Sequence, residues 1–187
     1  MPDNPVRSKI AKPLYDFNLL FSQKWNFFAP PPKSNSKLYF VYYSNEKPLY
    51  SCEVLSTILQ EKRAKAPFNS KEEAVDYIIS GSISQLTNYI ILNRENLSFQ
   101  NQTKKIEDLD SDARKILLAR TNDINEFKTL VNFSKIVAKK KIPEETVTKI
   151  NKIKIIITET EIPKFHDRYN KEPEEKLLLE TNYINYE

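Results

Sequence analysis

Glycine is almost absent from this chain, since Gly81 is the only one among 187 residues. Loops that cradle phosphate groups need several glycines, because their backbone amides must approach the ligand closely and adopt positive φ angles. The sequence therefore excludes a P-loop, a dinucleotide-binding fingerprint and a kinase-type glycine loop. We predict that the chain carries no cofactor.

Histidine and cysteine also occur only once each, as His166 and Cys52. A zinc site needs three or four nitrogen, sulfur or carboxylate ligands, so we predict no metal site. An enzyme in which Cys52 is the nucleophile and His166 its base, with carboxylates nearby, is an alternative. No motif surrounds either residue, and lone cysteines are commonly buried as small apolar side chains. We therefore favour a binding or accessory module and assign no catalytic residue.

The aromatic content indicates a chain that can form its own core. Hydrophobic residues make up 40% of the sequence, and ten tyrosines, ten phenylalanines and one tryptophan supply large apolar areas. A chain of this length can bury enough surface to fold alone, so we predict one folding unit. No run of 18 apolar residues occurs, so no segment of this sequence is expected to span a membrane.

The net charge is +4, and the densest basic cluster is Lys139, Lys140 and Lys141. Such a run could contact phosphates, so a cytoplasmic protein that binds nucleic acid or another ligand is an alternative. Lysines are also common in the last turn of a helix, where they suit the negative end of the helix dipole. We favour the helix end and expect no nucleic acid partner.

Strand signals flank a helical middle. Runs rich in Tyr, Phe and Val predict a hairpin of two strands at about 37–44 and 48–54. A run of β-branched residues predicts a strand at about 152–162, and a closing strand is expected at about 175–183. We therefore predict an α+β fold, in which a small antiparallel sheet is covered on one face by a helical middle at about 54–141, with an N-terminal helix in addition.

The strand that contains Ile153, Ile155 and Ile157 has a two-residue period that places these three on one face. Glu159 and Glu161 continue the same face. Two neighbouring carboxylates could divide the roles of acid and base. A solvent-facing row on a half-exposed sheet explains them equally well, and we favour that interpretation.

A capping box of Ser70 and Glu73 predicts the start of a helix, with Ser70 as the N-cap. This helix is expected to reach about residue 93, and Gly81 in its middle costs about 1 kcal/mol against alanine unless close packing requires it. A stripe at helical spacing is expected to be buried. Its members are Val75, Ile79, Ile83, Leu86 and Ile90.

Two further helices are expected in the middle of the chain. A polar loop should follow residue 93, after which Asp110 is expected to cap a helix that runs to about residue 121. A last long helix is predicted over 124–141. The residues expected to point inward from it are Ile124, Phe127, Val131 and Ile136.

An aromatic and proline-rich motif precedes the first predicted strand. The segment 21–32 reads FSQKWNFFAPPP and follows a predicted N-terminal helix. Aromatic rings stack well on proline, so a helix that runs into three prolines forms a rigid corner. Core packing is the simplest role for this corner, and contact with a partner or a peptide is the alternative. The residues concerned are Gln23, Trp25, Phe28, Ala29, Pro30 and Pro32.

These six residues match the Q-x-W-x-x-F-A-P-x-P signature of a bacterial family of unknown function, which the chain resembles. That family is similar to the accessory protein of the sporulation-delaying toxin system. In it the signature closely follows a transmembrane helix, and the soluble domain lies outside the cytoplasm. The resemblance implies that residues 1–33 form a helix and corner that follow a removed membrane anchor, and that residues 34–187 form the α+β domain.

The resemblance further implies a non-catalytic accessory or adaptor domain at the extracytoplasmic face of a bacterial membrane. Its implied partner is a multi-helix integral membrane protein, or a peptide that this membrane protein processes. The motif would then lie near the bilayer surface, and Trp25→Ala would be expected to abolish recovery of the partner while the fold stays intact.

Overall fold

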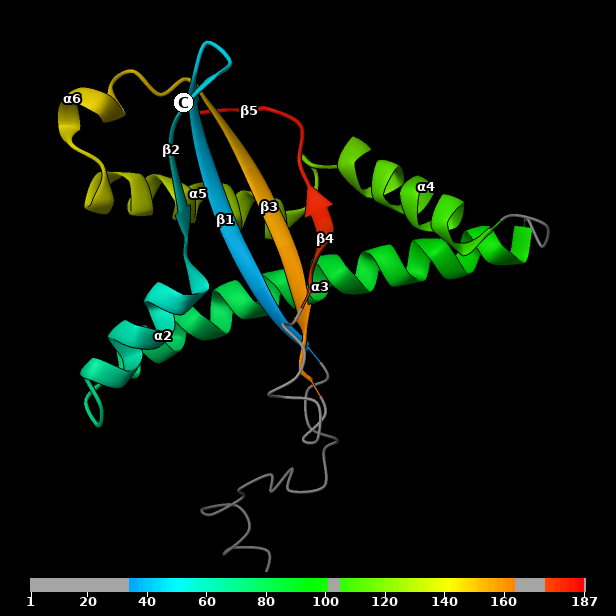
Figure 1. Cartoon of the computed structure of the whole chain (residues 1–187), viewed down its shortest axis with the longest axis horizontal. Coiled ribbons are helices and arrows are strands. Elements are labelled where there is room, and N and C mark those ends of the chain that lie inside the picture. Colours follow the sequence, from blue (N-terminus) through cyan, green and yellow to red (C-terminus); the bar gives the residue numbers. More distant parts are fainter. Residues whose placement is uncertain (1–33, 101–104, 164–173, 187) are drawn as a thin grey trace, which may run out of the picture. The chain divides into compact units, whose positions relative to one another are not determined.

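The computed structural model describes residues 34–100, 105–163 and 174–186, all of which belong to one compact unit that spans Lys33–Glu187. The helix and the corner predicted in residues 1–33 lie outside the described residues. Within the described part, a small antiparallel sheet is combined with helices (Figure 1). The predicted α+β class is therefore confirmed.

The elements follow one another as a hairpin, a run of helices and a second set of strands. They are β1 (Ser34–Ser44), β2 (Lys47–Glu53), α2 (Leu55–Ala64), α3 (Ser70–Gln100), α4 (Ile106–Ala119), α5 (Asn125–Lys141), α6 (Glu144–Val147), β3 (Lys152–Glu161), β4 (Glu175–Glu180) and β5 (Ile184–Asn185).

The sheet has the order β2-β1-β3-β4, and β5 pairs with the other end of β3. The predicted hairpin of β1 and β2 is confirmed, and it turns without a glycine. Asn45 and Glu46 both adopt positive φ angles, which the twist of a tight hairpin requires. Asn151 braces this turn, because its side-chain amide accepts a hydrogen bond from the Asn45 backbone amide at 3.1 Å.

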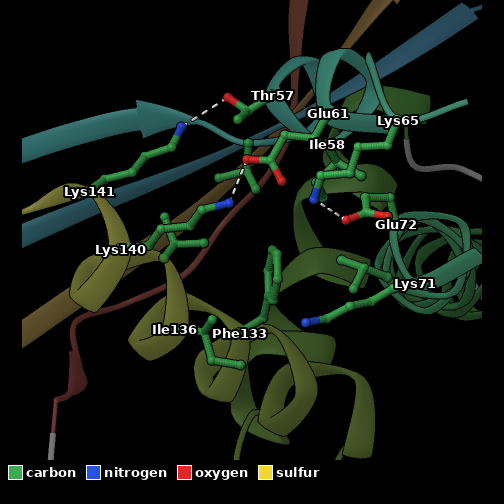
Figure 2. A pocket seen from close by; sticks show the side chains of 13 residues that line it. Thr57, Ile58, Glu61, Lys65, Lys71, Glu72, Phe133, Ile136, Lys140 and Lys141 are labelled. Atoms are coloured by element: carbon green, nitrogen blue, oxygen red, sulfur yellow. Dashed lines mark hydrogen bonds and ion pairs between the residues drawn. The ribbon is translucent and has the colours of Figure 1, made fainter. Parts of the chain in front are cut away.

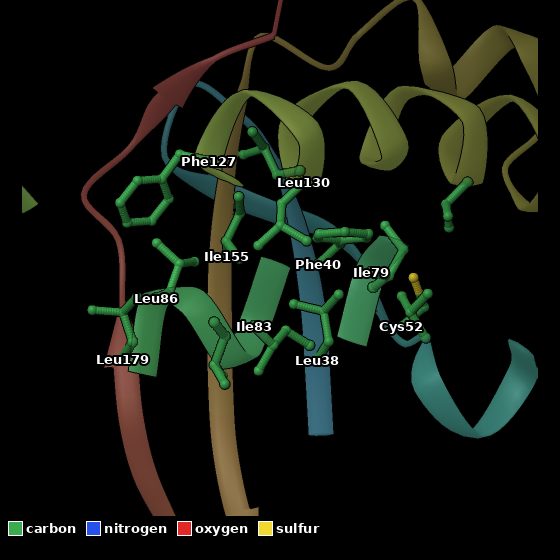
Figure 3. Close-up of a cluster of buried hydrophobic side chains, with 14 of the residues drawn as sticks. Leu38, Phe40, Cys52, Ile79, Ile83, Leu86, Phe127, Leu130, Ile155 and Leu179 are labelled. Carbon is green, nitrogen blue, oxygen red and sulfur yellow. The ribbon is translucent and has the colours of Figure 1, made fainter. Parts of the chain in front are cut away.

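Helices α3 and α5 cover one face of the sheet (Figure 1). The core forms where the inward side chains of β1 and β3 meet these helices. Figure 3 shows one such side chain from each element, namely Phe40 of β1, Ile155 of β3, Ile83 of α3 and Leu130 of α5. Phe40, Ile155 and Leu130 have no exposed surface. The predicted alternation of β3 is confirmed for its isoleucines, because burial of one strand face is what the two-residue period encodes.

The stripe predicted along α3 is confirmed. Four of its members are buried, and Val75 packs against the core with part of its surface exposed. The N-cap is one residue earlier than predicted, because Ser70 is already the first residue of α3 and the Asn69 carbonyl accepts a helical hydrogen bond from the Glu73 amide. The Asn69 side chain also donates to the Lys62 carbonyl at 3.1 Å, which ties the start of α3 to α2.

The prediction of a polar loop after residue 93 is wrong over most of that stretch. Helix α3 continues to Gln100, and α4 already begins at Ile106, so Asp110 lies inside a helix and not at its cap. Tertiary contacts explain both errors. Leu97 packs against the core, and Arg94 pairs with Asp110 at 3.3 Å, which joins the two helices along this polar stretch.

Helix α5 turns the predicted side to the core, with the exception of Ile136. Phe127 and Ile124 are buried and Val131 is half-buried, as expected, but Ile136 is 61% exposed. Spacing alone allowed two neighbouring faces of this helix to point inward. The sheet and α3 select the face whose buried members are Phe127, Leu130, Ser134, Val137 and Ala138.

The closing strand is shorter than predicted and is interrupted. Strand β4 ends at Glu180, and only Ile184 and Asn185 pair again, as β5. Thr181 occupies the break and is 2% exposed. Its backbone amide donates to the Ile155 carbonyl and its hydroxyl accepts from the Ile155 amide, both at 3.0 Å, so the side chain takes over one position of the ladder.

We expect Gly81→Ala to raise the free energy of unfolding of the isolated chain by about 0.5–1 kcal/mol, because alanine loses less backbone freedom in a helix. A Cβ atom at Gly81 would meet nothing within 4 Å, so no clash opposes this gain. Urea unfolding followed by circular dichroism measures the difference. Ser84→Ala, at another exposed position of α3, is the control and should change stability less; a destabilised Gly81→Ala chain would contradict the prediction.

Candidate functional site

The residues singled out by sequence are dispersed or lie outside the described part. All six motif residues and His166 are outside it. Cys52 is buried in the core on β2, and burial raises the pKa of its thiol. A catalytic cysteine needs an accessible thiolate, and a buried thiol with a raised pKa supplies little of it. The structure therefore gives the Cys52 alternative no geometric support.

One of the two carboxylates predicted to form a row on β3 has a side-chain partner. Glu159 accepts a hydrogen bond from the Ser34 hydroxyl, and Glu161 is exposed. Among the described residues, no group of three or more His, Cys, Asp or Glu side chains is placed to hold a metal ion. The part of the chain that the structure describes also contains no helix with the length and apolar character needed to cross a membrane.

A more strongly held carboxylate, which the sequence analysis missed, is Glu175 at the start of β4. It accepts hydrogen bonds from Lys37 at 2.6 Å, from Thr158 at 2.6 Å and from Tyr39 at 2.9 Å. The bonds from Lys37 and Thr158 lower the pKa of Glu175 to about 2. A carboxylate with so low a pKa is a weak proton acceptor. Its partners come from β1 and β3, so this cluster joins β4 to these two strands.

A pocket of about 290 Å³ lies where α2, α3 and α5 meet (Figure 2). Its floor is apolar and combines buried residues with partly exposed ones. The apolar residues that line it are Val54, Ile58, Val75, Phe133, Ile136 and Val137. The exposed Ile136 belongs to this set, so the residue that the core does not use forms part of the pocket wall.

The rim of the pocket is rich in lysine. Lys65, Lys71, Lys140 and Lys141 line it together with only two carboxylates, Glu61 and Glu72. Two of the predicted basic residues, Lys140 and Lys141, are thus at the end of α5, as expected for a helix end, and also at a pocket. No local sequence signal indicates this, because the lining residues come from three helices far apart in the chain.

Side-chain contacts bridge the rim. Lys140 pairs with Glu61 at 2.6 Å, and Lys141 donates to the Thr57 hydroxyl at 2.9 Å, so both contacts join α5 to α2 (Figure 2). Lys65 pairs with Glu72 and joins α2 to α3. This hydrogen bond raises the pKa of Lys65 and lowers the pKa of Glu72, so both groups are charged at neutral pH.

The side of α3 that faces away from the core is a second surface with an unusual composition. Residues 77–93 contain no charged side chain, although 29% of the whole chain is charged. We call the exposed row along this segment the outer face of α3. Its members, at helical spacing, are Ile78, Gly81, Gln85, Tyr89 and Leu92.

Apolar groups on the outer face are well exposed. Ile78 and Leu92 are each 54% exposed, and Tyr77 beside them is 83% exposed. Solvent-facing helix sides normally carry charged residues, so an uncharged side with several exposed apolar residues marks a surface that another molecule can cover. The apolar period of the sequence predicts the buried stripe of this helix but not this face.

Comparison of the chain with protein-family models, with curated proteins and with solved structures found no match.

Proposed function

We propose that this chain is a non-catalytic accessory domain that binds an integral membrane partner through the outer face of α3. The observation that carries the proposal is the absence of charge over residues 77–93 on a helix whose outer side is exposed. The resemblance of the Trp25 motif to a family with membrane partners supports the same function. The proposed location is the extracytoplasmic face of a bacterial membrane, and the peptide processed by that partner is the other proposed ligand.

The chemistry of the outer face favours an uncharged helix as the docking element. A charged partner segment would lose hydration against Ile78 and Leu92 without gaining an opposite charge. Gly81 lies between them on the same row, with open space where a Cβ would point. A residue that lacks a side chain allows another backbone to approach closely, as small residues do between packed helices. Gly81, which weakens the helix in the isolated chain, would then serve to let the partner helix approach closely.

Affinity purification of the protein from its host in mild detergent, with quantification of co-purifying proteins, tests the proposal. We expect Ile78→Glu to reduce recovery of a stoichiometric multi-helix membrane protein at least tenfold, because a carboxylate would be buried unpaired in the interface. Ile116→Glu is the matched control, since Ile116 is an exposed isoleucine on α4, and recovery should stay unchanged. Circular dichroism confirms that both variants fold.

Further variants locate the contact. Gly81→Ala should weaken partner recovery even though it stabilises the isolated chain, and this opposite effect separates docking from folding. Trp25→Ala tests whether the aromatic-proline motif contributes to the same contact. Equal recovery with Ile78→Glu and Ile116→Glu would remove the outer face from the function. If the purified chain forms dimers and Ile78→Glu dissociates them, the molecule that binds the outer face of α3 would instead be a second copy of this chain.

A further inference from the structure

The pocket between α2, α3 and α5 combines an apolar wall with an excess of positive charge. Four lysines line it against two glutamates. Glu61 and Glu72 are each already paired, with Lys140 and Lys65 respectively. Within the described part of the chain, Lys71 makes no hydrogen bond or ion pair, and it extends from α3 toward Phe133 (Figure 2). The Lys71 ammonium therefore has no hydrogen-bonded partner there, although its charge helps to lower the pKa of Glu72.

The volume and the apolar wall of the pocket suit a small apolar group. A volume of about 290 Å³ is at the lower end of the range for small-molecule pockets. Ile136 is exposed at its wall, and Phe133 is half-buried, so both present apolar surface that water now covers. Removing that surface from water is favourable and needs no directional contact. An apolar chain fits this wall better than a polar ligand does.

The contacts over the rim can exchange partners. Lys140 reaches Glu61 and Lys141 reaches Thr57, and these two contacts join α5 to α2 beside the pocket. Lys140 is 61% exposed, and exposed ion pairs of this kind contribute little to stability. An incoming anion can therefore take Lys140 from Glu61 at small cost while it pairs with Lys71.

We propose that this pocket binds a carboxylate that carries a single small apolar chain, with the chain against Phe133 and Ile136 and the carboxylate between Lys71 and Lys140. Lysine is a point charge with rotatable donors and suits a small monoanion. A free medium-chain fatty acid and the C-terminus of an apolar peptide share this chemistry. The proposal does not depend on partner docking at the outer face of α3.

Calorimetric titration of the full chain tests the proposal with sodium decanoate, kept well below micelle formation, and with an acetylated Leu-Leu dipeptide. Decanol and decyltrimethylammonium are the matched ligands without the negative charge. We expect decanoate to bind more tightly than both, and its affinity to fall with added salt, because the rim charges are exposed. If decanoate binds more tightly than the dipeptide, the natural ligand is a fatty acid; if the dipeptide binds more tightly, the ligand is the C-terminus of a peptide.

Variants distinguish the contribution of the Lys71 charge to ligand affinity from that of the apolar pocket wall. Lys71→Gln should weaken decanoate binding about three- to tenfold and leave decanol unchanged, since a hydrogen bond to a charged group at an exposed site is lost. Ile136→Ser should weaken both ligands. Lys149→Gln, an exposed lysine that does not line the pocket, is the control. All three positions are on the surface or at the pocket wall, so the core is kept, and thermal unfolding verifies the fold.

Three results would overturn the proposal. The first is no heat from either carboxylate up to millimolar concentration at two well-separated temperatures, because burial of apolar surface can release almost no heat near 25 °C. The second is equal binding of decanoate and decyltrimethylammonium, which would show that charge plays no part. The third is an equal affinity for decanoate in Lys71→Gln and Lys149→Gln, which would place the carboxylate elsewhere on the molecule.

Discussion

Replacing Ile155 with alanine is expected to lower the free energy of unfolding by about 2–5 kcal/mol. Ile155 has no exposed surface and lies on β3, between β1 and the β4 side of the sheet, where it faces the helices (Figure 3). The loss combines the transfer of the removed methyl groups with the cavity left behind. Close packing by Phe40, Ile83 and Leu130 in the same cluster limits how far the surroundings can collapse into that cavity.

Ile156→Ala is the matched control for Ile155→Ala, because it removes the same atoms from the next residue of the same strand. Ile156 points to the face of the sheet that the helices do not cover and is only half-buried. We expect it to lose less than half as much stability. Urea unfolding of both variants gives the comparison. Equal losses would mean that both faces of β3 are covered and that the one-sided arrangement of the helices is wrong.

The second large effect is expected from Tyr42→Phe, which should cost about 1–2 kcal/mol although it removes a single oxygen atom. Tyr42 is fully buried on β1, and its hydroxyl donates to the Ser134 carbonyl of α5 at 2.8 Å. Burial raises the pKa of this hydroxyl far above its ordinary value, so it stays a donor. The variant leaves a buried carbonyl without this partner, while the ring contacts of Tyr42 with Phe40 and Tyr186 persist.

Tyr50→Phe is the control for Tyr42→Phe. Tyr50 is half-buried beside Tyr42, with ring centroids 6.3 Å apart, and its hydroxyl has no hydrogen-bond partner among the described residues. Its removal should change stability by less than 0.5 kcal/mol, the usual range for such surface changes. If Tyr42→Phe costs no more than this control, the hydrogen bond that joins the sheet to α5 contributes nothing net to the fold.

Features that depend on neighbours in the chain could be predicted from the sequence. The burial of Ile153, Ile155 and Ile157, the hairpin of β1 and β2, and the buried stripe of α3 all follow from a local period of apolar residues. Such a period repeats within a few residues and places side chains on one face whatever lies opposite. The confirmed α+β class follows from the order of these local signals.

Features that depend on a choice between equivalent local solutions could not be predicted. The polar residues after position 93 are compatible with a loop or a helix, and tertiary contacts favour the helix, among them the packing of Leu97 and the pairing of Arg94 with Asp110. In α5, Ile136 and Val137 are adjacent apolar residues, and either could point inward. The sheet and α3 take Val137 and leave Ile136 to the solvent.

The candidate sites divide in the same way. The sequence by itself determined which strand and helix faces are apolar, and it showed that a chain with one glycine, one histidine and one cysteine lacks the common nucleotide-binding loops and histidine-cysteine metal sites. Only the tertiary structure decided that Lys71 of α3 and Lys140 of α5 flank one apolar pocket, and that a Cβ atom added at Gly81 would point into open space. The physical reason is that a period is written into neighbouring residues, whereas a pocket is made by helices that the core brings together across long stretches of chain.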